Sequence, residues 1–120
     1  MSDADLFLSA QDGQLAVDVL ETRDAIIIRS AVAGIKPEDL HIHVEGDLVT
    51  IRGERKHKKE IHDATVHYEE CFWGTFSRSI ILPHAVKPEE ADATFTDGVL
   101  ELTIPKTRGE MDVKVRDLSA

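Results

Sequence analysis

Apolar residues occupy every second position on both sides of Asp97-Gly98, within the stretch ATFTDGVLELTIPK at residues 93–106. A period of two places one set of side chains on a single face of a β-strand. Asp-Gly is the dipeptide that best tolerates the left-handed backbone of a two-residue hairpin turn. The pattern therefore predicts a β-hairpin with one buried face. We expect pairing to end at Pro105, which has no N–H to donate to a neighbouring strand.

Other parts of the chain also show the patterns of β-strands. Residues 40–45 (LHIHVE) alternate strictly, and a Gly-Asp turn dipeptide separates them from a second apolar run, which predicts another hairpin. The stretch 25–32 (AIIIRSAV) is a nearly continuous run of β-branched residues, so we expect both of its faces to be covered. The predicted strands lie at residues 15–20, 25–32, 40–45, 48–53, 66–70 and 75–83, and in the hairpin of residues 93–104.

These strands predict an all-β fold. The sequence has no helical period over more than two turns, and seven or eight short strands separated by Gly, Pro and Asp are typical of a sandwich or barrel. A strand that ends at a proline, as residues 75–83 do, indicates an open edge, which favours a two-sheet antiparallel β-sandwich. We expect a short N-terminal arm at residues 1–14, the folded domain at residues 15–106, and a polar tail at residues 107–120.

The charge limits the classes of partner that fit this chain, and the cysteine content limits the cellular compartment. The 120 residues carry 14 basic and 23 acidic side chains, a formal net charge of −9. This charge disfavours nucleic acid and anionic membranes as partners. The single cysteine, Cys71, excludes an internal disulfide and suits a reducing compartment. The sequence has neither a secretory signal nor an apolar run near the roughly 20 residues that span a bilayer, so we expect a cytoplasmic protein.

Candidate catalytic and metal-binding residues are few. The sequence has no nucleophile elbow, phosphate-binding loop or His-Glu-x-x-His motif, so we expect neither an enzyme nor a cofactor. His41 and His43 are spaced to bind a metal together, but no third ligand is specified and the alternation already places both on the solvent face. The basic cluster at residues 52–59 lacks aromatic residues on which bases would stack, and we interpret it as a solvated loop.

Three motifs in order resemble the α-crystallin domain of small heat shock proteins. Residues 93–106 resemble the Ala-x-x-x-x-Gly-Val-Leu signature and terminal Pro-Lys of that domain. Residues 15–55 look like its opening strands, and residues 74–83 (GTFSRSIILP) look like its Phe-x-Arg-x-x-x-Leu-Pro strand. The resemblance implies a two-sheet sandwich, strand-exchange homodimers and ATP-independent holding of partly unfolded client proteins.

Other parts of the chain depart from the pattern of this family. Ala33-Gly34 stands where the family usually has Pro-Gly, which loosens the turn without changing the fold. The family's C-terminal Ile-x-Ile motif is represented by Val113 and Val115, the candidate tail anchor. The arm, often long and apolar in the family, is short here. Its apolar run, a possible client contact, consists of Leu6, Phe7 and Leu8.

The segment 66–70 (VHYEE) is too polar to be a core strand of its own sandwich. We expect it to cross to a second subunit and pair with the edge strand near residues 16–20, which would hide two edges prone to aggregation. The resemblance implies the same kind of dimer. The candidate interface residues are Val66, His67, Tyr68, Glu69, Glu70, Arg78, Val17 and Val19.

Arg78 has the same parity as Phe76 and Ile80, so a charge lies on an apolar face of its strand. Its side chain either extends to water or forms an ion pair, and the resemblance favours an ion pair at the dimer interface. Cys71 lies beside Phe72, and we expect a buried, inert thiol near that interface rather than a redox switch.

Two functions of different classes fit these residues. The first is a holding chaperone whose tail docks into the edge groove of a neighbouring subunit, as the resemblance implies. The alternative is a co-chaperone or adaptor resembling the CS domains, which are generally monomeric. A dimer or larger species would favour the chaperone. The expected groove residues are Ile42, Val44, Ala93 and Phe95, and the same groove is a candidate surface for client proteins.

Overall fold

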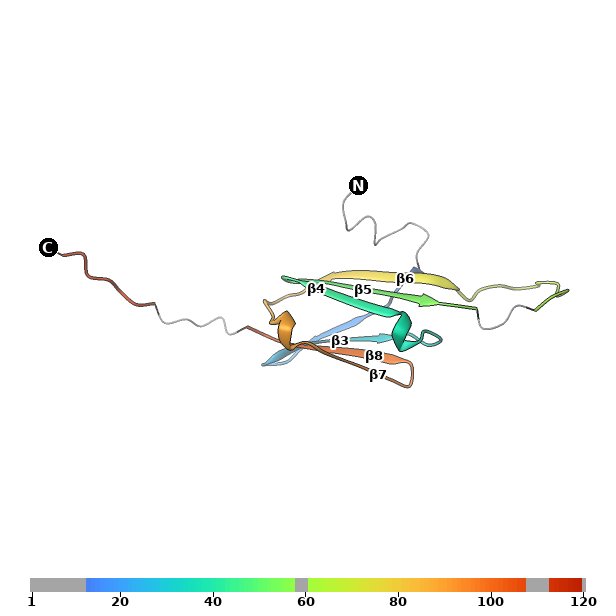
Figure 1. Cartoon of the computed structure of the whole chain (residues 1–120), viewed down its shortest axis with the longest axis horizontal. Coiled ribbons are helices and arrows are strands. Elements are labelled where there is room, and N and C mark those ends of the chain that lie inside the picture. Colours follow the sequence, from blue (N-terminus) through green and yellow to red (C-terminus); the bar gives the residue numbers. More distant parts are fainter. Residues whose placement is uncertain (1–12, 58–60, 108–112, 120) are drawn as a thin grey trace.

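The computed structural model describes residues 13–57, 61–107 and 113–119, and its strands form two four-stranded sheets packed face to face (Figure 1). In one sheet the strand order is β1-β6-β5-β4, and in the other it is β2-β3-β8-β7. The predicted all-β, two-sheet sandwich is confirmed. The first sheet consists of β1 (Gly13–Gln14), β6 (Gly74–Ile81), β5 (Leu48–Arg55) and β4 (Leu40–Glu45). The second consists of β2 (Asp18–Glu21), β3 (Ala25–Ala31), β8 (Val99–Pro105) and β7 (Asp92–Thr96).

Two short 3-10 helices complete the described elements. They are η1 (Pro37–Asp39), which precedes β4, and η2 (Pro88–Glu90), which precedes β7. Each begins at a proline, whose fixed φ suits the first position of a helical turn.

The core between the sheets is aliphatic and follows the alternation in the sequence. In β8 every second residue is buried, as the hairpin pattern predicts. In β3, however, only one face is buried, which corrects the expectation that both faces are covered: Ile26 and Ile28 are buried, whereas Arg29 is exposed. The reason is that a two-layer sandwich leaves the outer face of each sheet in contact with solvent.

The two predicted hairpins form as expected. In the β7–β8 turn, φ is 52° at Asp97 and 77° at Gly98, and two successive positive φ values define the type I′ turn that suits twisted strands. In the β4–β5 turn, Gly46 has a φ of 61°. β8 ends at Pro105, and the carbonyl of this residue accepts a hydrogen bond from the N–H of Lys87 at 2.9 Å.

The single strand predicted at residues 15–20 is wrong. β1 and β2 belong to different sheets, and β1 pairs with β6 in parallel. The chain crosses between the layers at Leu15, which is buried, and Ser30 fixes the crossing by donating its hydroxyl to the Ala16 carbonyl at 2.8 Å. An apolar residue at Leu15 continues the alternation of a strand, although here it fills the space between two sheets.

The polar segment 66–70 is not a strand within its own chain, and all five of its residues are exposed. It lies in the connection between β5 and β6, whose described residues 61–73 project beyond the end of the sandwich (Figure 1). At the opposite end, residues 113–119 of the tail are exposed and contain no strand. The expected boundaries of arm, domain and tail remain predictions.

Candidate interaction surfaces

Edge strands supply the first candidate surface. Among the residues that the structure describes, β2 pairs with β3 alone, so its other side presents unpaired main-chain groups. The predicted interface residue Val19, on this strand, is exposed, and its neighbour Leu20 is exposed as well. Val17, just before the strand, is half-buried and packs against the core. The structure therefore leaves an apolar strand edge open where the sequence predicts a dimer contact.

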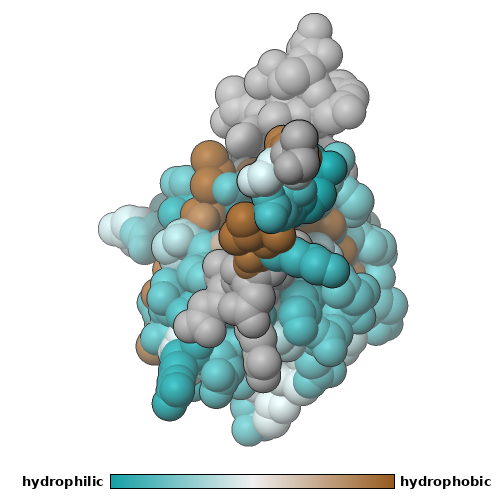
Figure 2. All heavy atoms as spheres, turned by 90° about the vertical axis from the view of Figure 1, so that its left-hand side faces the viewer, coloured by the Kyte–Doolittle hydropathy of each residue, from teal (hydrophilic) through white to brown (hydrophobic). Residues whose placement is uncertain are grey.

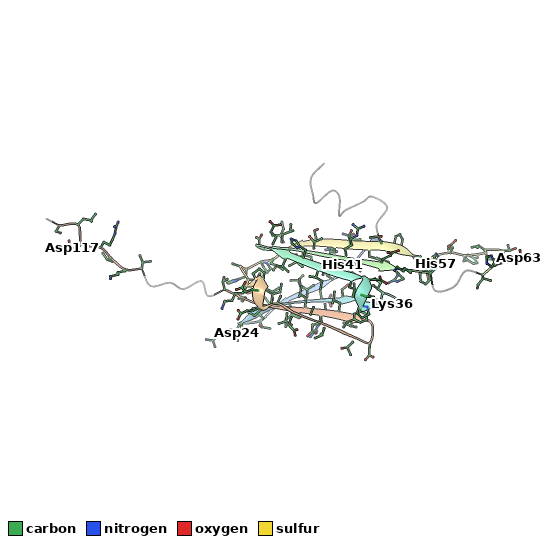
Figure 3. All side chains as sticks on the ribbon, in the orientation of Figure 1. Asp24, Lys36, His41, His57, Asp63 and Asp117 are labelled. Carbon is green, nitrogen blue, oxygen red and sulfur yellow. The ribbon has the colours of Figure 1, made fainter. Side chains whose placement is uncertain are left out.

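The projecting segment supplies the surface that we expect to pair with β2 of another subunit. Val66 is 65% exposed and Tyr68 is 89% exposed. Asp63 lies at the far end of this segment, well away from the sandwich (Figure 3). Pairing of this segment with β2 of another subunit remains a prediction. The other interface candidates of this segment are also exposed, namely His67, Glu69 and Glu70.

Arg78 lies beside the crossing that leads into β2. Its side chain is half-buried, and Nη1 donates a hydrogen bond to the Leu15 carbonyl at 3.1 Å. Arg78 stands opposite Ile51 in the β5–β6 register, which confirms that it shares the inward face of the sheet. Among the residues that the structure describes, no ion pair includes Arg78. The intersubunit ion pair is therefore still a prediction, and the bond to Leu15 uses only part of the donor capacity of the guanidinium.

The residues expected to line the tail groove lie on the edge strands β4 and β7. Ile42 and Val44 are half-buried and pack against the core, and so is Phe95, whereas Ala93 is exposed. Both members of the candidate tail anchor, Val113 and Val115, are exposed. Docking of the tail along these edges is untested. The possible client contact at Leu6, Phe7 and Leu8 lies outside the residues that the structure describes.

His41 and His43 lie on the solvent face of β4, as predicted. Nε2 of His43 is 3.7 Å from a carboxylate oxygen of Glu45, and both side chains are largely exposed. Within residues 13–57, 61–107 and 113–119, no three side chains of the His, Cys, Asp or Glu types cluster to hold a metal ion.

The expectation of a buried thiol at Cys71 is wrong for the single chain. The side chain is exposed and carries no disulfide. The ring of the next residue, Phe72, contacts Phe76, and the ring of Trp73 contacts His57.

Sequence reasoning missed two clusters of side chains. One surrounds Arg55 at the base of the projecting segment, close to an open pocket of about 580 Å³. Two lining residues of this pocket, Lys36 and His57, lie at the same end of the sandwich (Figure 3). No local pattern in the sequence predicts the contacts of either cluster, because its members come together only through the fold. The residues that line the pocket are Gly34, Ile35, Lys36, Pro37, Asp39, Lys56 and His57.

The second missed cluster forms around Lys106, the last residue of the Pro-Lys signature. Its side chain is only 13% exposed, and Nζ donates to Glu21 Oε2 at 2.7 Å and to the Thr22 carbonyl at 2.8 Å. Its backbone N–H donates to the Asp24 carbonyl at 2.8 Å. Lys106 therefore fastens the end of β8 to the β2–β3 turn, where the tail begins.

Comparison with known proteins identifies the family. The model of the "Hsp20/alpha crystallin family" matches residues 10–119. The chain belongs to this family. The match agrees with the resemblance in the sequence motifs, and membership of a small heat shock protein family bears out the expectation that the protein is not an enzyme.

Bacterial and plant proteins are among the relatives of this small heat shock protein. It is 33% identical over 74% of its length to Small heat shock protein C2 of Rickettsia felis, and spans 58% of that relative. It is 37% identical over 86% of its length to a 17.4 kDa class I heat shock protein of Arabidopsis thaliana, and spans 67% of that protein.

A solved structure shares the fold of this family member. Heat shock protein 16.0 from Schizosaccharomyces pombe superposes with a TM-score of 0.73 at 27% identity, covering 88% of this chain and 98% of that one. In the described part of the chain, no helix is long and apolar enough to cross a bilayer. The surface at the tail end of the molecule is mainly hydrophilic, with apolar side chains in small separate groups (Figure 2).

Proposed function

We propose that this small heat shock protein is an ATP-independent holding chaperone that binds partly unfolded proteins and suppresses their aggregation in the cytoplasm. The observation that carries the proposal is the open edge of the sandwich at β4 and β7, where Ile42, Val44 and Phe95 are only half-buried, in a chain of this family. An unfolding chain exposes the same two features, unpaired main-chain groups and apolar side chains, so it can pair with such an edge.

A second open edge supports the proposal. β1 pairs only with Phe76 and Ser77 of β6, so the rest of β6 has no neighbouring strand on that side among the described residues. Ile81, at the end of β6, is exposed although it is large and apolar. Apolar contacts of this kind are worth about 25 cal/mol per Å² of buried surface and form reversibly. Binding of this kind uses no nucleotide.

The open side of β2 supports assembly with other copies of the chain. In the proposed homodimer, residues 66–70 of one subunit add a strand to the open side of β2 in the other, and Arg78 forms an ion pair across the interface. Two such exchanges would cover both copies of the exposed Val19 and Tyr68. Contacts made by the tail through Val113 then give only weak association between dimers. The match to the Hsp20/alpha crystallin model supports the chaperone over the adaptor resembling CS domains.

An aggregation assay tests the function. A heat-labile enzyme is warmed with an excess of the protein and without nucleotide, and light scattering is followed over time. The proposal expects delayed and reduced scattering with several different enzymes. Protection that requires ATP, or no protection of any of them, would show that the protein is not a holding chaperone.

A further inference from the structure

The connection that carries residues 66–70 leaves and re-enters the sandwich at one place. Arg55, the last residue of β5, stands directly opposite Gly74, the first residue of β6. Contacts made by the Arg55 side chain therefore lie at the base of the connection. Figure 3 shows His57 at this end of the sandwich and Asp63 at the far end of the projecting segment.

Arg55 joins three separate parts of the chain at this point. Its Nε donates to the Ala33 carbonyl at 2.8 Å, in the turn between β3 and η1. Its Nη1 donates to the Phe72 carbonyl at 3.2 Å, on the returning side of the connection. The guanidinium carbon also lies 4.4 Å from the centre of the Phe76 ring. One side chain thus ties the returning segment to the turn and to β6.

Aromatic contacts hold the same region from both sides. Phe72 packs edge-on against Phe76, with ring centroids 4.8 Å apart. His57, on the outgoing side, lies against Trp73, on the returning side, at 4.9 Å. Phe72 and Trp73 are 37% and 38% exposed, whereas Tyr68 farther out is 89% exposed. The base of the connection is therefore packed on the sandwich, and the segment beyond it is presented to solvent.

The neighbouring glycines leave room for these contacts. A Cβ atom at Gly34, where φ is +82°, would lie 3.4 Å from Cδ of Arg55. A Cβ atom at Gly13 would lie 2.8 Å from the Phe76 ring and 3.0 Å from the Phe72 ring. A lysine in place of Arg55 would keep the charge but lose the planar fork that serves two carbonyls and a ring face together.

We infer that Arg55 is a positioning residue for strand exchange between the two subunits of the dimer. It fixes the base of the connection, so that residues 66–70 are held out in a defined direction. Presenting a segment from a fixed base reduces the conformational entropy lost when it binds. The inference rests on the proposed strand-exchange dimer. It adds that a residue outside the exchanged segment helps to set the affinity of the dimer.

The test compares Arg55→Lys with a matched control, Arg29→Lys. Arg29 forms an ion pair with Glu101 at 2.9 Å on the outer face of the other sheet, so the control also replaces a paired arginine. Sedimentation velocity over a range of concentrations should give a dimer dissociation constant raised roughly tenfold for Arg55→Lys, a cost of about 1.4 kcal/mol, and unchanged for Arg29→Lys. Thermal melting should show both variants fully folded at the temperature of the experiment.

Trp73, the only tryptophan in the chain, provides a second measurement at the base itself. In Arg55→Lys, its emission should shift to longer wavelength and acrylamide should quench it more strongly, because the Phe72–Trp73 segment is released. A wild-type dissociation constant together with wild-type Trp73 quenching would overturn the inference while leaving the dimer intact. A wild-type protein that is monomeric at all concentrations would instead refute strand exchange, and with it this role of Arg55.

Discussion

Nζ of Lys106 lies 2.7 Å from Oε2 of Glu21, so the last residue of the Pro-Lys signature is paired with the last residue of the edge strand β2. This hydrogen bond lowers the pKa of Glu21 below its ordinary value, with a smaller contribution from the positive charge of Lys106. The pair connects the strand edge proposed for dimerisation to the residue from which the tail departs.

Acid should weaken this connection. Because the pKa of Glu21 is lower in the folded protein, its contribution to stability is present above the ordinary glutamate pKa of about 4.3 and is lost as the pH falls through the folded value. Glu21→Gln should therefore lower the melting temperature at pH 7 and have little effect near pH 2. Glu89→Gln, on exposed η2, is the control. An equal effect of Glu21→Gln at both pH values would contradict the lowered pKa.

Ala33→Pro should stabilise the domain. Ile35 donates its N–H to the Val32 carbonyl at 3.2 Å and Gly34 has a φ of +82°, which is the geometry of a type II turn with Ala33 at the position where proline is favoured. Proline there should add about 0.4–1 kcal/mol by restricting the unfolded chain. Urea denaturation measures the change. Gly34→Ala should have the opposite effect, and a destabilised Ala33→Pro would refute the turn assignment.

Removing the exchange segment should give folded monomers. Deletion of residues 57–70, with a short glycine linker in their place, leaves every described strand of both sheets intact. Analytical ultracentrifugation should then show a monomer at concentrations where the full chain is a dimer, with an unchanged β-sheet circular dichroism spectrum. A dimer of the same affinity would mean that the subunits associate through another surface.

Arg78→Ala should weaken the dimer as well. If Arg78 pairs with a carboxylate of the partner subunit, its loss should cost about 1–3 kcal/mol at this half-buried position. Arg78→Lys keeps the charge and should recover part of the affinity. Should both variants dimerise like the wild type, the guanidinium serves only the Leu15 carbonyl and the intersubunit ion pair is excluded.

Association beyond the dimer should depend on the tail. Each valine at positions 113 and 115 offers one methylene less than isoleucine, and two such losses of about 0.8 kcal/mol make docking roughly fifteenfold weaker. Val113→Gly with Val115→Gly should therefore leave the dimer intact and abolish larger species, whereas isoleucine at both positions should promote them. Native mass spectrometry distinguishes these outcomes, and a large particle that survives the glycine substitutions would rule out assembly through this tail.

Local patterns in the sequence were enough to predict the hairpins and the fold class. The turn at Asp97-Gly98 and the alternation of β4 depend only on neighbouring residues and on one buried face, so both are visible in the chain. The division of residues 15–20 was not predictable in this way. Leu15 continues the apolar alternation, and only the positions of β6 and β3 decide that the chain changes sheets there.

The exposed residues of the candidate interaction surfaces could be predicted, because their neighbours in the sequence are polar. Residues whose burial depends on contacts with distant parts of the chain could not be predicted. The open positions of Tyr68 and Val113 agree with polar surroundings in the sequence. Arg55 belongs to a charged stretch that predicts a solvated loop, yet it is half-buried between two carbonyls and a ring. Contacts between residues 33, 55 and 72 arise from the packing of the two sheets, which no local pattern specifies.

The most direct test of the account is native mass spectrometry of the protein mixed with a thermally unfolding enzyme in the absence of nucleotide. A holding chaperone should give complexes that contain subunits of this chain and the unfolded enzyme, and the amount of complex should rise as light scattering falls. If the enzyme aggregates to the same extent with and without the protein and no mixed complex is detected, the proposed chaperone function is wrong.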